Sequence, residues 1–216
     1  MPNWCNNYIK ISGEESTIRT LTSVIKSLKS SDDDGPSDYV FQSLIGIPPY
    51  MSEGDYKEKW YDTNIEWFGT KWDVSYEEHM FTFDKDEITI SCETAWSPPI
   101  PFLENLCRMY KTNAYLFYSE GGVGFAGETL FNWVDGELEV DDEECGFLEG
   151  LYKFSKDEFW SEVEYRTDCI EEEEMSLEDF LSEYDFVSDE DKVELTTIYN
   201  EATNNIYDED DDTEGE

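Results

Sequence analysis

Four side chains near the middle of the chain could form a small polar site. Lys71 and Asp73 flank Trp72 in the segment WFGTKWD, and Glu93 and Trp96 follow in the segment ITISCETAWSPP. Alternate residues of a strand point to one face, so Lys71 and Asp73 would share a face, with Glu93 close by on a neighbouring strand. Together they could bind a small ligand or support catalysis. Equally, Lys71 and Asp73 could form an ion pair that fixes a hairpin, and spacing alone does not separate these readings.

Clusters of acidic residues form a second candidate site, on a surface that a partner could bind. The residues are Asp141, Asp142, Glu143, Glu144, Glu171, Glu172, Glu173, Glu174, Asp189, Glu190 and Asp191. They lack the regular Asp/Asn/Gly pattern of a calcium loop, which disfavours a metal site. They could simply be solvated, or they could imitate the phosphates of a duplex, which carries about one charge per 1.7 Å of axis.

Other residue types that often carry chemistry lack the expected context. The glycines between residues 121 and 127 are not followed by Lys-Ser/Thr, so they predict a turn rather than a phosphate loop. The 5 cysteines include no CxxC pair, and His79 is the single histidine. Cys5 and Cys92 are therefore expected to be small buried hydrophobes, and we expect no zinc site, no cofactor and no enzymatic activity.

The charge balance restricts the partners. The 54 Asp and Glu residues against 14 Lys and Arg give a net charge of -40. Binding to nucleic acid or to an anionic membrane requires basic side chains, so neither is expected, and the predicted partner is a protein with a basic surface. No run approaches the ~20 apolar residues of a membrane span. No signal-peptide pattern opens the chain, which predicts a cytoplasmic protein.

The spacing of apolar residues predicts the order of the elements. Period-two alternation marks strands, and apolar residues three or four apart mark helices. The predicted elements are a strand at 7–12, a helix at 14–30, a loop at 31–37, an extended segment at 40–47, an irregular stretch with up to one helical turn at 50–63, strands at 66–75 and 80–93, a helix at 102–110, a strand at 114–119, and a further strand or hairpin at 127–140 with a turn at Asp135-Gly136.

This order predicts an α+β fold, the ferredoxin-like split β-α-β sandwich with an antiparallel sheet. We expect this domain to span residues 1–140. An acidic, mainly helical extension follows at 141–207, with helices capped by Ser155, Ser176 and Ser188. The acidic tail at 208–216 is expected to be disordered.

Several segments of the first part resemble one known family. They are PNWCNN, FxxLIGIPP, WFGTKWD, TAWSPP and YSEGGVGFAG. In this order they are similar to the ferredoxin-like proteins of the YubB type, which bacteriophages and conjugative plasmids encode. The resemblance covers residues 1–140 and implies a fold and a mobile-element origin, without implying a reaction.

Charge and origin together suggest a function. We expect a phage or plasmid accessory protein that binds a host nucleic-acid-binding or defence protein, such as a nuclease, and inhibits it through a surface that mimics DNA. One alternative is a ligand-binding or catalytic domain that uses a cleft near Lys71 and Trp96. Another is a structural protein whose acidity only maintains solubility.

Overall fold

The computed structural model describes residues 3–30, 38–168 and 176–209, with side chains described up to residue 203 and that of residue 168 excepted. The chain divides into two compact units, residues 1–145 and 146–216, and each is treated by itself. The predicted loop at 31–37, the acids at 171–174 and most of the predicted tail lie outside the described residues.

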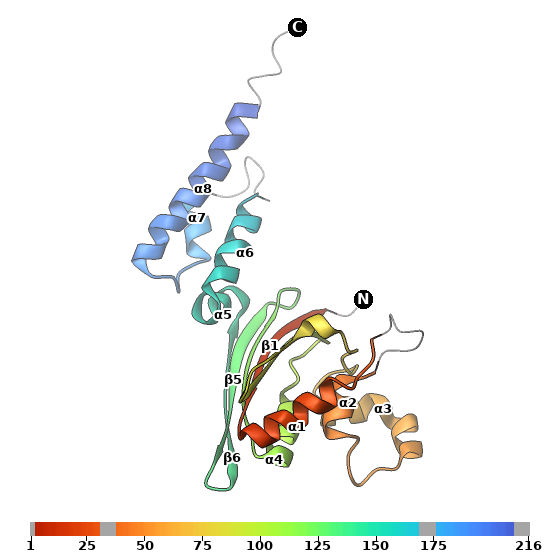
Figure 1. Ribbon diagram of the computed structural model, residues 1–216. Helices are drawn as coiled ribbons and strands as arrows, with labels where there is room; N and C mark the ends of the chain where they lie inside the picture. The colour runs from red at the N-terminus through yellow and green to blue at the C-terminus, as the bar shows by residue number, and fades with distance from the viewer. Residues whose placement is uncertain (1–2, 31–37, 169–175, 210–216) are drawn as a thin grey trace. The chain divides into compact units, whose positions relative to one another are not determined.

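A six-stranded sheet forms the framework of the first unit (Figure 1). Its strands are β1 (Trp4–Ser12), β2 (Phe81–Phe83), β3 (Glu87–Ala95), β4 (Asn113–Glu120), β5 (Phe125–Val134) and β6 (Glu137–Gly146). They lie in the order β2-β3-β1-β4-β5-β6, and the registered pairs among β1 to β5 are antiparallel. β1 lies inside the sheet between β3 and β4, and its alternate residues from Cys5 to Ile11 are buried, so one face of the strand packs against the core.

Two amphipathic helices, α1 (Glu15–Ile25) and α4 (Ile100–Tyr110), cover one face of this sheet (Figure 1). Ile18, Leu21 and Ile25 of α1 are buried at helical spacing. Full burial of each such side chain contributes about 1.5–3 kcal/mol of transfer free energy. The unit therefore has the split β-α-β arrangement, and the predicted α+β ferredoxin-like fold is confirmed.

The segment between α1 and β2 differs from the prediction. Residues 40–47, expected to be extended, contain helix α2 (Val40–Ile45), and residues 50–63 lie largely within helix α3 (Glu53–Trp67). α3 begins with a capping box in which Ser52 and Asp55 satisfy each other's backbone N–H groups.

The predicted strand at 66–75 is also wrong. Its first two residues end α3, the chain then continues in turns and bends, and within the segment only Ser75 forms a bridge, to Tyr39. Gly69 has a φ of 83°, and the Thr70 side chain bonds to the backbone of Ala95. The predicted single strand at 80–93 is the hairpin of β2 and β3.

The hairpin predicted at Asp135-Gly136 is confirmed. Both residues have positive φ, 50° and 91°, as a two-residue turn with the twist of the flanking strands requires. β6 continues to Gly146, so Asp141 to Glu144 lie on a strand of the first unit rather than on a helical extension.

Four helices form the described part of the second unit. They are α5 (Phe147–Phe154), α6 (Lys156–Asp168), α7 (Leu177–Ser182) and α8 (Asp189–Glu209). Their core is aromatic, with Phe159, Phe180 and Tyr184 buried. The Ser176 and Ser188 hydroxyls each accept a backbone N–H three residues on, which confirms two of the three predicted caps, and Ser155 lies at the C-terminal end of α5.

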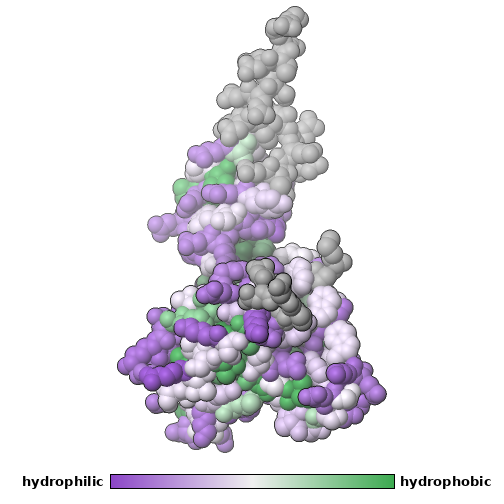
Figure 2. All heavy atoms as spheres, turned by 45° about the vertical axis from the view of Figure 1, so that its right-hand side comes forward, coloured by the Kyte–Doolittle hydropathy of each residue, from purple (hydrophilic) through white to green (hydrophobic). Residues whose placement is uncertain are grey.

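Hydrophilic residues cover most of the visible surface of each unit, with small apolar patches between them (Figure 2). Within the ranges that the structure describes, no helix is both long and apolar enough to cross a bilayer.

Candidate functional site

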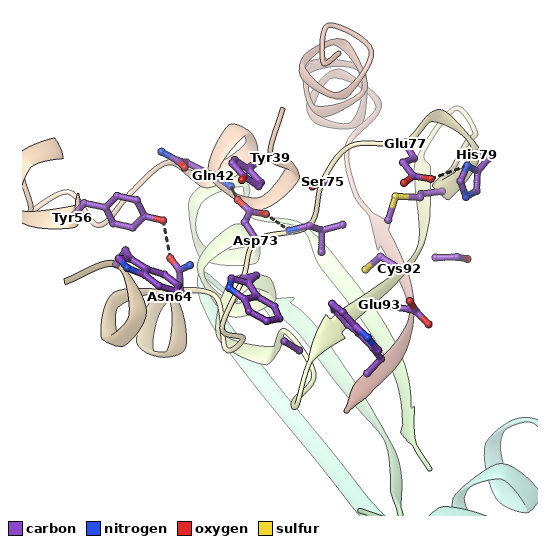
Figure 3. A pocket seen from close by; sticks show the side chains of 17 residues that line it. Tyr39, Gln42, Tyr56, Asn64, Asp73, Ser75, Glu77, His79, Cys92 and Glu93 are labelled. Carbon is purple, nitrogen blue, oxygen red and sulfur yellow. Dashed lines mark hydrogen bonds and ion pairs between the residues drawn. The ribbon is translucent and has the colours of Figure 1, made fainter. Parts of the chain in front are cut away.

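A cavity of about 760 Å³ opens in the first unit beside the end of β3 (Figure 3). One wall comes from β3 and β1, and the other from α3 and the segment 72–80. The lining includes Trp4, Tyr39, Tyr56, Trp60, Asn64, Trp72, Asp73, Glu77, His79, Cys92 and Glu93. We call this cavity the β3 cleft.

The rim of the β3 cleft carries large aromatic side chains that remain open to solvent. Trp4 is 46% exposed, Tyr39 52%, Trp60 39% and Trp72 38%. The rings of Trp4 and Trp72 lie 6.1 Å apart, tilted by 39°. Each exposed indole would bury a large apolar area against a partner, and such residues commonly dominate binding energy.

Lys71 does not pair with Asp73, contrary to one reading of the sequence. Among the described residues its Nζ lies over the rings of Trp72 and Trp96, 4.4 and 4.7 Å from their centroids. These are cation–π distances, and the two indoles thus already bind one cation of the protein itself.

Trp96 adopts an unusual backbone conformation next to the cleft. Its φ of 74° lies in the left-handed region, which bulky residues rarely occupy. Its N–H donates to the Asn3 carbonyl at 3.0 Å, which links the end of β3 to the start of β1. This strained conformation is the one that sets the indole beside Lys71.

Asp73 lies at the centre of the cleft wall and caps α2 (Figure 3). Its carboxylate accepts the N–H groups of Phe41 at 2.8 Å, Gln42 at 2.7 Å and Val74 at 2.6 Å. Burial raises the pKa of Asp73 to about 6, against the opposing effect of these donors. The side chain is thus committed to holding α2 in place.

β3 contributes Cys92 and Glu93 to the opposite wall (Figure 3). Cys92 is buried, as predicted, and burial raises the pKa of its thiol to about 12, so the thiol is protonated at neutral pH. The Glu93 side chain is exposed.

Two further pairs of side chains shape the ends of the cleft. The Tyr56 hydroxyl donates to Asn64 Oδ1 at 2.7 Å, and the Asn64 amide donates to the Lys71 carbonyl at 3.0 Å. His79 Nδ1 and Glu77 Oε2 lie 3.4 Å apart, and both side chains are exposed.

The structure thus groups the four predicted residues in one region but gives them different roles. Asp73 and Glu93 line the cleft, whereas Lys71 and Trp96 form the neighbouring cation–π pair. Sequence reasoning missed Trp4, Tyr39 and Trp60. The sequence does contain one sign of these residues: an aromatic side chain at a position that the pattern of its element directs to solvent. Trp4 is an example, because it stands at an exposed position of the alternating strand β1.

The described acidic clusters belong to different units, and two of their members form hydrogen bonds within their own unit. Asp142 accepts the Thr129 hydroxyl at 2.6 Å, inside the β5–β6 hairpin. Asp191 accepts hydrogen bonds from Tyr152, Lys156 and Ser188 at 2.7 to 2.9 Å. Asp189 and Glu190 are exposed in the first turn of α8. Within the described ranges, no group of three or more His, Cys, Asp or Glu is arranged to hold a metal ion.

A family model described as the ferredoxin-like domain in Api92-like protein matches residues 71–186, just over half of the chain. The chain belongs to this family. The match extends beyond residue 140, where the motif resemblance ended, and the family description names a fold and no activity.

Two other comparisons add little. The crystal structure of protein api92 from Yersinia pseudotuberculosis is similar over 68% of this chain and 99% of that chain, with 10% sequence identity and a TM-score of 0.31. No curated protein matches the sequence.

Proposed function

We propose that the protein is a non-enzymatic binding protein for a basic surface of another protein, and that the β3 cleft makes the specific contact. The observation that carries this proposal is the ring of exposed Trp4, Tyr39, Trp60 and Trp72 around a cavity of about 760 Å³. Exposed aromatic surface of this kind marks interaction sites.

Charge favours a basic partner. A net charge of -40 attracts cationic surfaces over long range and raises the rate of encounter. Exposed Glu93 and Glu77 place carboxylates at the cleft itself. Aromatic faces also bind cations, as Trp72 and Trp96 do with Lys71.

Binding suits the cleft better than catalysis. Asp73 and Cys92 are two lining residues whose side chains could in principle transfer a proton or attack a substrate. Asp73 accepts three backbone N–H groups, and the Cys92 thiol is buried and protonated at neutral pH. Neither is poised to attack a substrate.

The partner we propose is a host nucleic-acid-binding protein, such as a defence nuclease, which the protein inhibits by occupying its basic surface. A phage or plasmid origin is part of this proposal. Asp191 contributes less to DNA mimicry than the sequence suggested, because Lys156 pairs with its charge, whereas Asp142 remains exposed although Thr129 donates to it. Asp189 and Glu190 remain exposed on an ordered helical turn.

Affinity capture from host lysate tests the proposal. The full chain, a Trp60→Ala variant and a Tyr165→Ala control would be immobilised, the control because Tyr165 is 66% exposed in the second unit. We expect basic proteins to bind at low salt, to be retained by Tyr165→Ala, and to bind about tenfold less to Trp60→Ala. Equal capture by both variants would show that the cleft is not the contact.

A further inference from the structure

One residue of β3 presents its backbone to the β3 cleft without a partner strand. The Glu87 carbonyl accepts the Asp84 N–H at 2.9 Å, so the polar backbone groups of Glu87 point towards β2. In an antiparallel strand, alternate residues direct both their N–H and their C=O to the same side. The register of β3 with β1 has no bulge between Glu87 and Glu93, which are an even number of residues apart. The N–H and C=O of Glu93 therefore also point to the side on which β2 lies.

β2 ends before it reaches Glu93. Its last pair in this direction is Phe81 with Ile90, and the chain then turns away through the 3-10 helix Glu78–Met80. The far end of the edge is closed, because the Thr70 hydroxyl accepts the Ala95 N–H at 3.0 Å and donates to the Ala95 carbonyl at 3.2 Å.

Glu93 lies between these two limits. Of the described residues, none places a donor or acceptor within hydrogen-bonding distance of its N–H or C=O. Glu93 lines a cavity of about 760 Å³, which is large enough to admit a chain segment. An open strand edge is a template for pairing with another chain.

The surroundings select the chemistry of such a segment. The Glu93 side chain is exposed, Glu77 borders the same cleft, and the indoles of Trp4 and Trp60 line it, whereas the Trp72 indole already contacts Lys71. Carboxylates and aromatic faces favour Lys and Arg, whose aliphatic stems pack on indoles while their charged ends reach carboxylates.

We propose that the β3 cleft binds a short, extended, basic segment of a partner protein, which adds as a strand beside Glu93. Main-chain hydrogen bonds to Glu93 would hold the segment, and the indoles and carboxylates would select its side chains. This inference rests on the proposed function, since it specifies how the basic partner is recognised.

The probe is a blocked hexapeptide of alternating Lys and Val, titrated into the full chain labelled for amide NMR. We expect chemical-shift changes at Ser91 and Glu93, and hydrogen exchange of the Glu93 amide slowed at least about tenfold at saturation. Two N-methylated peptides provide the decisive comparison. Methylation of the amides that face β3 should weaken binding about tenfold, and methylation of the alternate amides should leave it nearly unchanged.

A Glu93→Gln variant separates charge from backbone pairing. It should bind the peptide more weakly at low salt, yet it should retain the difference between the two methylated peptides. Equal binding of both methylated peptides, or no change at Glu93 with millimolar peptide, would overturn strand addition. If strand addition is overturned but Trp60→Ala still captures less basic protein from lysate, the proposed function stands. If Trp60→Ala captures as much as the full chain, the proposed function itself is rejected.

Discussion

At the residue scale, single polar side chains hold together segments that are distant in sequence. The Thr70 hydroxyl is fully buried and serves both the N–H and the C=O of Ala95. Asp73 caps a helix that begins more than thirty residues earlier. These contacts position the cleft walls, and they depend on one hydroxyl and one carboxylate.

Thr70→Val should destabilise the first unit by about 1–3 kcal/mol, because it leaves two buried backbone groups of Ala95 unpaired while nearly conserving volume. Urea unfolding followed by tryptophan fluorescence measures this, since six of the seven tryptophans lie in the first unit.

Thr112→Val is the matched control. The Thr112 hydroxyl is buried and has no hydrogen-bond partner in the described chain apart from the weakly polar Cys107 thiol. Removing it should be neutral or slightly stabilising. Equal losses in both variants would mean that the Thr70 hydrogen bonds contribute nothing specific.

Asp191 is a structural acid of the second unit. Hydrogen bonds from Lys156, Tyr152 and Ser188 lower its pKa to about 2, from about 3.9 in an unfolded chain. At a pH between these two pKa values, the Asp191 carboxyl is more often protonated in the unfolded state than in the folded state. The stabilisation from Asp191 is therefore fully present above about pH 4 and is lost as pH falls towards 2.

Asp191→Asn should lower the stability of the second unit by about 1–2 kcal/mol at neutral pH, since a charge-assisted network is lost. The difference from wild type should shrink as pH falls below 4. Thermal unfolding followed by circular dichroism measures both, with Asp189→Asn as control because Asp189 is exposed. A difference independent of pH would argue against an ionised Asp191.

At the element scale, the sequence predicted those elements whose signals are local. The α1 periodicity and the Asp135-Gly136 turn each lie within a few residues, and both were correct. α2 was not predictable in this way, because its cap is the distant Asp73. Ser52 and Asp55 form a capping pair that indicates the start of α3. Pro48 and Pro49 shortly before it are more typical of irregular structure, which is what we predicted.

The same limit applies to the candidate site. WFGTKWD has the composition of a strand, yet Gly69 takes a left-handed φ and Thr70 bonds to β3, so the segment becomes an irregular cleft wall. The cluster of Lys71, Asp73, Glu93 and Trp96 was placed in the correct region. The roles of its members depend on tertiary neighbours that spacing does not reveal.

The β5–β6 hairpin depends on close backbone packing at Gly127. A Cβ there would meet the Glu143 carbonyl oxygen, and would come within 2.6 Å of the Tyr118 hydroxyl. Gly127→Ala should therefore cost about 1–3 kcal/mol, as overpacking does. Urea unfolding measures the cost, and Gly146→Ala is the control, because its φ is -59° and nothing lies within 4 Å. A neutral Gly127→Ala would show that β6 can move away freely.

At the scale of the whole molecule, charge is the dominant property and is unevenly divided. Residues 146–216 carry 26 acidic and 4 basic side chains, whereas residues 1–145 carry 28 and 10. Like charges repel one another most strongly in the compact state, so this surplus opposes folding while it promotes encounter with basic partners. The two effects are screened by the same salt.

Raising NaCl from about 0.01 to 0.15 M should therefore increase thermal stability, because the screening length falls from about 30 Å to about 8 Å. Screening also weakens attractive pairs such as Lys156 with Asp191, but with 54 acids against 14 bases the repulsion outweighs the attraction. Tryptophan fluorescence reports mainly the first unit, and circular dichroism reports the helices of both units. The shift should therefore be larger for the transition that circular dichroism detects without a matching fluorescence change, that of the second unit, than for the transition that both signals report. As a control, KCl at the same ionic strength should raise the melting temperature as much as NaCl does, since screening does not depend on the ion.

A melting temperature that falls with salt would contradict the prediction. It would mean that specific ion pairs outweigh the repulsion, and that the acidic side chains are arranged to stabilise the fold rather than to reach a partner.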